Sequence, residues 1–255
     1  MTIRQHFTTL FNLLWIGGCA LALVIQTRLM VGLPTTPGWL DGLVFGSTVF
    51  GYYCTHPLPG YRGLAWMLAA GAMGCFLMLD KTTQWLAVGP ALLWGAYYGL
   101  QRPGRSGLRT LPAAKPVVIA LAWAWVTVWL PARQLLWPLF AARATFVFAL
   151  ALAYDLTDLA YDRRHQLTTL VSKIGESRAH QRIYMALGLA TMWVGFGFLL
   201  KIISLPVTIA IWATYLITPF ALLWVLNSQA QVAWQKVAID GLMVLQALLV
   251  WLALR

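Results

Sequence analysis

Three of the seven acidic residues of this chain, Asp155, Asp158 and Asp162, fall within eight consecutive positions. Their i, i+3, i+7 spacing predicts a helix that carries the three carboxylates on one face, about one turn apart. Like charges this close repel each other, so a cation is expected to compensate them. Mg²⁺ suits the arrangement because it takes one or two carboxylates, keeps several waters and binds substrate phosphates. The cluster therefore predicts a metal site for a phosphorylated ligand; the alternative is an acidic helix end paired with basic residues such as Arg163 and Arg164.

Two basic segments accompany the acidic cluster, and together they favour an anionic ligand. The first precedes an apolar run and contains Arg102, Arg105, Arg109 and Lys115. The second comes after the cluster and contains Arg163, Arg164, Lys173 and Arg178. A bias of basic residues toward the cytoplasmic side of a membrane explains any one of them equally well. Only the two segments taken jointly indicate a binding site.

The elements that must position these residues are membrane helices. Hydrophobic residues make up 60% of the 255 positions and charged residues only 10%, with a mean hydropathy of +0.73. A soluble domain needs roughly a quarter of its residues charged. The apolar runs are continuous and lack the alternating pattern of a membrane barrel. We therefore predict an all-α, polytopic membrane bundle that forms one domain over residues 1–255.

Nine apolar segments are long enough to be considered as membrane helices. They cover about 10–31, 40–58, 63–79, 84–100, 116–131, 144–160, 182–200, 204–225 and 238–254. With a cytoplasmic N-terminus, twelve basic residues fall on the cytoplasmic side: Arg4, Arg62, Arg102, Arg105, Arg109, Lys115, Arg163, Arg164, Lys173, Arg178, Arg182 and Lys236. Six fall on the other side: Arg28, Lys81, Arg133, Arg143, Lys201 and Arg255. This bias predicts an integral membrane protein whose N-terminus lies in the cytoplasm, together with its two longest connections, 101–115 and 161–181. It also explains the net charge of +11 by contact with anionic lipid instead of nucleic acid.

The stretch from Asp155 to Gly175 resembles the second aspartate-rich motif of the UbiA-type membrane prenyltransferases. That motif has an Asp-x-x-Asp-x-x-x-Asp core, a basic pair, and then a Gly, a Thr and a further Gly. The matching residues are Asp155, Asp158, Asp162, Arg163, Arg164, Thr169 and Gly175, and Gln166 stands where the family has its first Gly. The segment from Tyr97 through Lys115 to Trp123 also resembles the loop after the fourth helix of that family.

The resemblance implies a nine-helix bundle around a cavity that opens to the cytoplasm or laterally to lipid. In that family Mg²⁺ binds the diphosphate of a prenyl donor, and the allylic cation formed when diphosphate leaves alkylates a lipophilic acceptor. Carried over to this chain, Asp155, Asp158 and Asp162 are expected to be metal ligands. The expected diphosphate contacts are Arg105, Arg109, Lys115 and Arg163.

The chain departs from the family at the end of its second apolar segment. The first aspartate-rich motif belongs there, and this chain has no carboxylate between Phe50 and Leu58. Asp41 lies about 22 Å away along the helix and cannot replace it. His56 is a candidate catalytic group that donates a hydrogen bond to diphosphate, acts as a base or binds a metal softer than Mg²⁺, and Tyr53 is a weaker candidate. Equally, His56 can be an ordinary polar residue at a helix end before Pro57.

Three kinds of function remain compatible with the sequence. The first is an enzyme that transfers or cyclises a prenyl chain, as the second motif and the basic segments favour. The second is an accessory membrane protein that keeps the fold without the chemistry, as the missing first motif favours. The third is a transporter, for which paired broken helices in two related halves are expected and are not evident.

Overall fold

The protein is all-helical in the part that the structure describes. The computed structural model describes residues 3–55, 60–99, 113–159, 164, 169–228 and 230–255. The long helices are α1 (Ile3–Met30), α2 (Trp39–Thr55), α3 (Arg62–Leu77), α4 (Lys81–Gly99), α5 (Ala114–Ala124), α7 (Trp137–Thr157), α10 (Glu176–Leu199), α11 (Leu205–Leu226) and α12 (Val232–Ala253). A π-helical stretch (Trp125–Trp129) and α6 (Leu130–Ala132) continue α5, and the short α9 (Leu170–Ile174) precedes α10.

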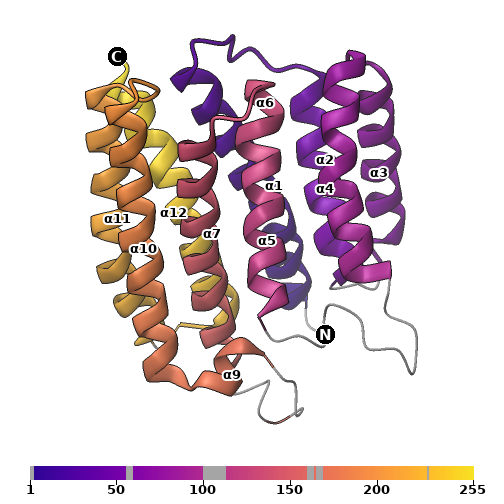
Figure 1. The fold of residues 1–255 in the computed structure, drawn as a ribbon. Coiled ribbons are helices and arrows are strands. Elements are labelled where there is room, and N and C mark those ends of the chain that lie inside the picture. Colours follow the sequence, from indigo (N-terminus) through magenta and orange to yellow (C-terminus); the bar gives the residue numbers. More distant parts are fainter. Residues whose placement is uncertain (1–2, 56–59, 100–112, 160–163, 165–168, 229) are drawn as a thin grey trace.

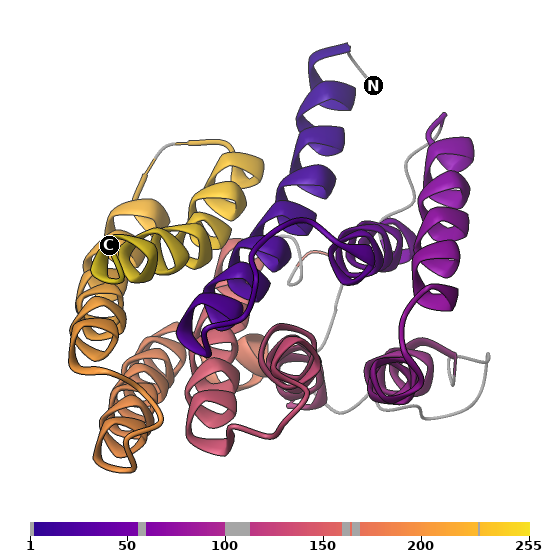
Figure 2. The same ribbon diagram turned by 90° about the horizontal axis from the view of Figure 1, so that it is seen from above.

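The long helices run side by side and alternate in direction, so that their ends form two faces (Figure 1). Most neighbours in the chain are also neighbours in space, and α12 packs against α1 to close the arrangement (Figure 2). The N-terminus, the start of α5, the end of α7 and α9 lie at one end, the lower end in Figure 1. This alternation places Asp155, Asp158 and Lys115 at the same end of the bundle.

Six of the helices are long and apolar enough to cross a membrane. They are Leu10–Met30 of α1, Ala114–Ala132, α7, α10, α11 and α12. Their outer surface is apolar too: Trp224 of α11 and Leu199 of α10 are each about three-quarters exposed. Such large apolar side chains are solvated by lipid in a membrane and would be a liability in water. The chain is an integral membrane protein, whereas the crossing of α2, α3 and α4 stays a prediction.

Several predicted boundaries are wrong because charged residues belong to helices, as two examples show. The segment predicted at 144–160 begins at Trp137, with Pro138 in the first turn, where proline is tolerated. Arg143 therefore lies inside α7 and not in a connection; it is 1% exposed and donates to Gln26 Oε1 of α1 at 2.7 Å. Likewise, the last segment begins at Val232, so Lys236 belongs to α12. In both cases the charged group contacts a residue of another segment, Gln26 for Arg143 and Asp158 for Lys236, although Arg143 Nη1 stays buried without a hydrogen-bond partner among the described residues.

Candidate functional site

The first half of the candidate site joins the end of α7 to the start of α5. Asp155 is in the last turn of α7 and Lys115 in the first turn of α5. Lys115 Nζ lies 2.5 Å from Asp155 Oδ1. The carboxylate is buried, with 2% of its side chain exposed, while 41% of the lysine side chain is exposed. A buried carboxylate is thus held by a cation that still reaches the polar end of the bundle.

The second half joins α7 to α12. Asp158 comes directly after the last residue of α7, and its Oδ2 lies 2.7 Å from Lys236 Nζ in the second turn of α12. Both side chains are partly exposed. The ammonium also stands 5.5 Å from the ring centroid of Tyr154, a distance at which a cation is attracted to the aromatic face. Asp158 and Tyr154 are four residues apart, so Lys236 bridges one face of α7.

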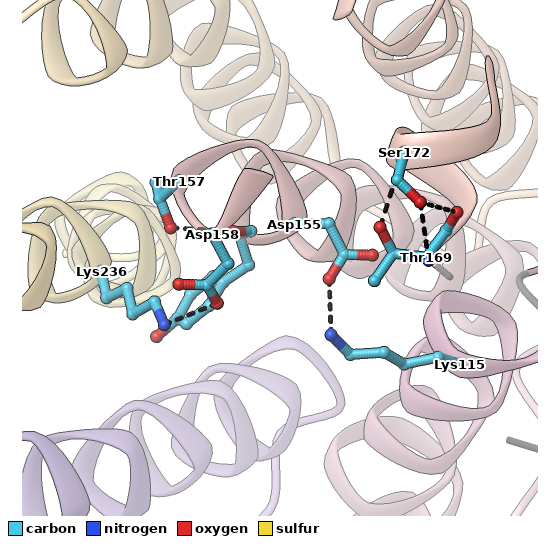
Figure 3. Close-up of polar contacts among 8 residues, drawn as sticks. Lys115, Asp155, Thr157, Asp158, Thr169, Ser172 and Lys236 are labelled. Carbon is cyan, nitrogen blue, oxygen red and sulfur yellow. Dashed lines mark hydrogen bonds and ion pairs between the residues drawn. The ribbon is translucent and has the colours of Figure 1, made fainter. Parts of the chain in front are cut away.

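The two carboxylates do not converge on one point. Figure 3 shows Asp155 directed at Lys115 and Asp158 directed at Lys236, on different neighbouring helices. Because α7 ends at Thr157, it carries Asp155 and has Asp158 as its C-cap residue, and the placement of all three aspartates on one helical face stays a prediction. Asp162 lies outside the described residues, as do Arg105, Arg109 and Arg163. Of the four predicted diphosphate contacts, only Lys115 can be placed, and it lies at the site.

The chain leaves this site through a short capped helix. The Thr169 side chain accepts from Ser172 N at 3.2 Å, and Ser172 Oγ accepts from Thr169 N at 2.9 Å, a reciprocal cap at the start of α9. Gly175 has a φ of +83°, which a residue with a side chain rarely adopts, and it separates α9 from α10. Thr169 and Gly175 of the predicted motif therefore shape the backbone beside the aspartates.

The end of α2 contributes aromatic residues and no acidic side chain among those described. Tyr53 is half-buried and packs against a small cluster around Leu13 and Val49, on the α1–α2 side of the bundle. This packing does not test a catalytic role for Tyr53. His56 lies outside the described residues. Tyr52, one residue earlier than Tyr53, also packs against the main core, to which α7 contributes.

Sequence reasoning missed two partners of this region. Lys236 was expected in a connection, although it pairs with Asp158. Asp240 was not singled out, although it is 5% exposed in α12 and accepts a hydrogen bond from the Tyr154 hydroxyl. The available signal was the i, i+4 spacing of Lys236 and Asp240, since two charged residues on one face of an apolar helix are costly in lipid.

The arrangement is suited to a diphosphate ligand. Two ammonium groups and two carboxylates from three helices meet at one end of the bundle, and both lysines keep partly exposed side chains. Mg²⁺ can be held by one carboxylate together with phosphate and water oxygens, so Asp155 and Asp158, although directed at different helices, each fit that ion in type. Within the described part of the chain no three ligating side chains are grouped around one point. A metal here must therefore draw its remaining ligands from the diphosphate and from water.

Comparison with known proteins gives one kind of match. No family model matches the chain, and no curated protein matches it. A solved structure of digeranylgeranylglyceryl phosphate synthase, a UbiA-type membrane prenyltransferase, superposes with a TM-score of 0.60 at 14% identity. The superposition covers 98% of this chain and 99% of that one. Over nearly its whole length, the chain therefore shares its fold with this synthase.

Proposed function

We propose that the protein is a UbiA-like intramembrane prenyltransferase that uses a prenyl diphosphate donor and a lipophilic acceptor. The observation that carries the proposal is the placement of two aspartate–lysine pairs, Asp155–Lys115 and Asp158–Lys236, at the polar end of a bundle with this fold. An acidic cluster that served only solubility would not need a buried Asp155. The proposal also places this end and the N-terminus in the cytoplasm, as the distribution of basic residues favours.

The residues act on the donor through charge. Diphosphate departure places negative charge on phosphate oxygens, and Lys115 and Lys236 can turn from their carboxylates to these oxygens. Asp155 and Asp158 would hold Mg²⁺ in their place, with Asp162 as a further ligand. When bound, Mg²⁺ supplies Lewis-acid stabilisation of the leaving diphosphate. The apolar surroundings of α1, α7 and α12 keep water from the allylic carbon.

Two alternatives share the donor site and differ in the fate of the donor. A terpene cyclase would bind and ionise the same donor without an acceptor. A catalytically inactive accessory protein would bind lipid or a partner. Substitutions at the two aspartates would then change that binding, and no turnover would be found in the parent or in the variants. The absence of a carboxylate from the described end of α2 is the observation that favours the accessory role.

Thermal stabilisation of the purified protein in detergent tests the donor site. Farnesyl and geranylgeranyl diphosphate are added separately, with and without Mg²⁺. A ligand present at a hundred times its Kd adds about 2.7 kcal/mol to the free energy of unfolding. We expect a rise in melting temperature that needs Mg²⁺ and disappears in Asp155→Ala and Asp158→Ala.

Asp80→Ala is the matched control, because Asp80 pairs with Arg133 at the opposite end of the bundle. It should lower the melting temperature of the free protein without changing the shift caused by the donor. If neither donor shifts the parent, or if Asp155→Ala and Asp158→Ala keep the full shift, the proposed site is wrong.

A further inference from the structure

The strongest unexplained feature near the site is a buried carboxylate on α12. Asp240 is 5% exposed, and the Tyr154 hydroxyl donates a hydrogen bond to its Oδ2. Asp41, Asp80, Asp155 and Asp158 each form a salt bridge with a lysine or arginine. No salt bridge joins Asp240 to a lysine or arginine in the described ranges. A carboxylate in a membrane-spanning helix is costly, and such residues usually serve function.

Helix geometry ties this carboxylate to the candidate site. Lys236 and Asp240 are four residues apart on α12, and Tyr154 and Asp158 are four residues apart on α7. The two faces meet, because Asp158 binds Lys236 and Tyr154 binds Asp240. Each step of four residues moves about 6 Å along a helix. The Tyr154–Asp240 pair therefore lies one turn deeper in the bundle than Asp158.

If Asp158 and Lys236 hold a diphosphate, the reacting carbon of the prenyl donor is expected about one turn deeper in the bundle, at the level of Tyr154 and Asp240. The allylic carbon C1 is bonded directly to a diphosphate oxygen, so it lies within about one helical turn of the phosphates. The prenyl chain is apolar and must extend away from the polar end. Tyr154 is only partly buried, whereas Asp240 is 5% exposed. Asp240 also lies close to α1, because the Cys19 thiol donates to its backbone carbonyl at 3.5 Å.

We propose that Tyr154 and Asp240 are the proton-accepting pair of the reaction, a role that rests on the proposed function. As the C1–O bond breaks, its electron pair leaves with diphosphate. A protic acceptor forms its bond to C1 and gives its proton to Tyr154 Oη, while the Tyr154 proton passes to Asp240 Oδ2. Tyr154 touches the acceptor, and Asp240 acts through it. Lys236, beside the Tyr154 ring, offsets the negative charge of the pair before transfer.

The pair also bears on the missing carboxylate of α2. In this chain α2 presents tyrosines where the resembling family has a carboxylate, and α12 brings a carboxylate to the same end of the bundle. General base catalysis contributes about 100-fold to 10,000-fold to a rate. Loss of the pair should therefore reduce transfer strongly without touching the groups that hold the diphosphate.

The test uses Tyr154→Phe and Asp240→Asn in the full chain. Both substitutions preserve shape, and the Asp240→Asn amide oxygen can still accept the Tyr154 hydrogen bond, so folding should persist. Tyr215→Phe is the control, because it also removes a buried hydroxyl, one that donates to the Ala142 carbonyl at 3.5 Å. Protein in liposomes that contain a total lipid extract of its source cells receives radiolabelled geranylgeranyl diphosphate and Mg²⁺. Labelled lipid measures transfer, labelled geranylgeraniol measures capture of the cation by water, and melting temperature measures donor binding.

We expect Tyr154→Phe and Asp240→Asn to lower transfer by about 100-fold or more while keeping the donor-induced melting shift. Labelled alcohol should rise as a share of the products, which a purely structural role would not cause. If the variants transfer within about threefold of the parent, or if they lose donor binding together with transfer, the proton-accepting role of Tyr154 and Asp240 is wrong. If the parent binds donor but transfers nothing, the donor site stands and the proton-accepting role is wrong. A parent that binds no donor refutes the proposed function itself.

Discussion

The Asp155–Lys115 pair should respond unequally to removal of its two partners. Lys115→Met leaves a carboxylate that is 2% exposed, whereas Asp155→Asn leaves an ammonium that is 41% exposed and can regain water. Removing the Lys115 ammonium from the buried carboxylate costs about 3 kcal/mol, the low end of the range for buried pairs. Freeing a half-exposed ammonium costs about 1 kcal/mol, as for surface pairs. At about 2–4 °C per kcal/mol, the melting temperature should fall by about 6–12 °C in the first variant and about 2–4 °C in the second.

The assay is thermal unfolding of the purified variants in one detergent at neutral pH without donor. The double variant, which carries Lys115→Met and Asp155→Asn together, should be more stable than Lys115→Met alone, because it no longer buries a carboxylate that has lost the Lys115 ammonium. Equal losses in the two single variants, with an additive loss in the double variant, would contradict this expectation. That outcome would mean that the two side chains do not interact in the folded protein.

Three further changes test the fold around the site. Gly175→Ala should lower stability by about 1–3 kcal/mol because of its φ of +83°, whereas Gly188→Ala, in open space on α10, should raise it slightly; melting temperatures decide. Arg143→Met should raise the melting temperature, because burying a guanidinium without a described carboxylate partner costs more than leaving Gln26 Oε1 without its donor. A clear fall in melting temperature would contradict this expectation. Hydrogen bonds from Thr83, with Arg133 nearby, hold the pKa of Asp80 below its usual value, so this stabilisation is present at neutral pH and is lost as pH falls through the folded-state pKa. Thr83→Val should flatten the acid side of the melting profile, and an unchanged profile would exclude that role.

Much of the fold could be predicted from apolar runs alone, since a membrane helix must be long and apolar. The errors arose where a charge interrupts such a run. Arg143 and Lys236 resemble the ends of segments, yet each forms a hydrogen bond across the bundle, to Gln26 and Asp158 respectively. These hydrogen bonds join residues that are 117 and 78 positions apart, so they cannot be predicted from the local sequence.

The site could be predicted in part. Three aspartates in one short stretch identified the end of α7, and the basic segment identified Lys115. The direction of each carboxylate could not be predicted, because it depends on where α7 stops and on which helix packs beside it. Asp240 was missed for a similar reason, because its hydrogen-bond partner Tyr154 lies 86 positions away in the chain.

Release of diphosphate is the sharpest test of the proposed function. The purified protein in liposomes that contain a total lipid extract of its source cells receives geranylgeranyl diphosphate and Mg²⁺, and inorganic diphosphate is measured over time. We predict Mg²⁺-dependent release by the parent and by Asp80→Ala, and none above background by Asp155→Asn or Asp158→Asn. Equal release by the parent and the two site variants, or no release by a parent that is folded and binds the donor, would contradict the assignment of this end of the bundle as a prenyl transfer site.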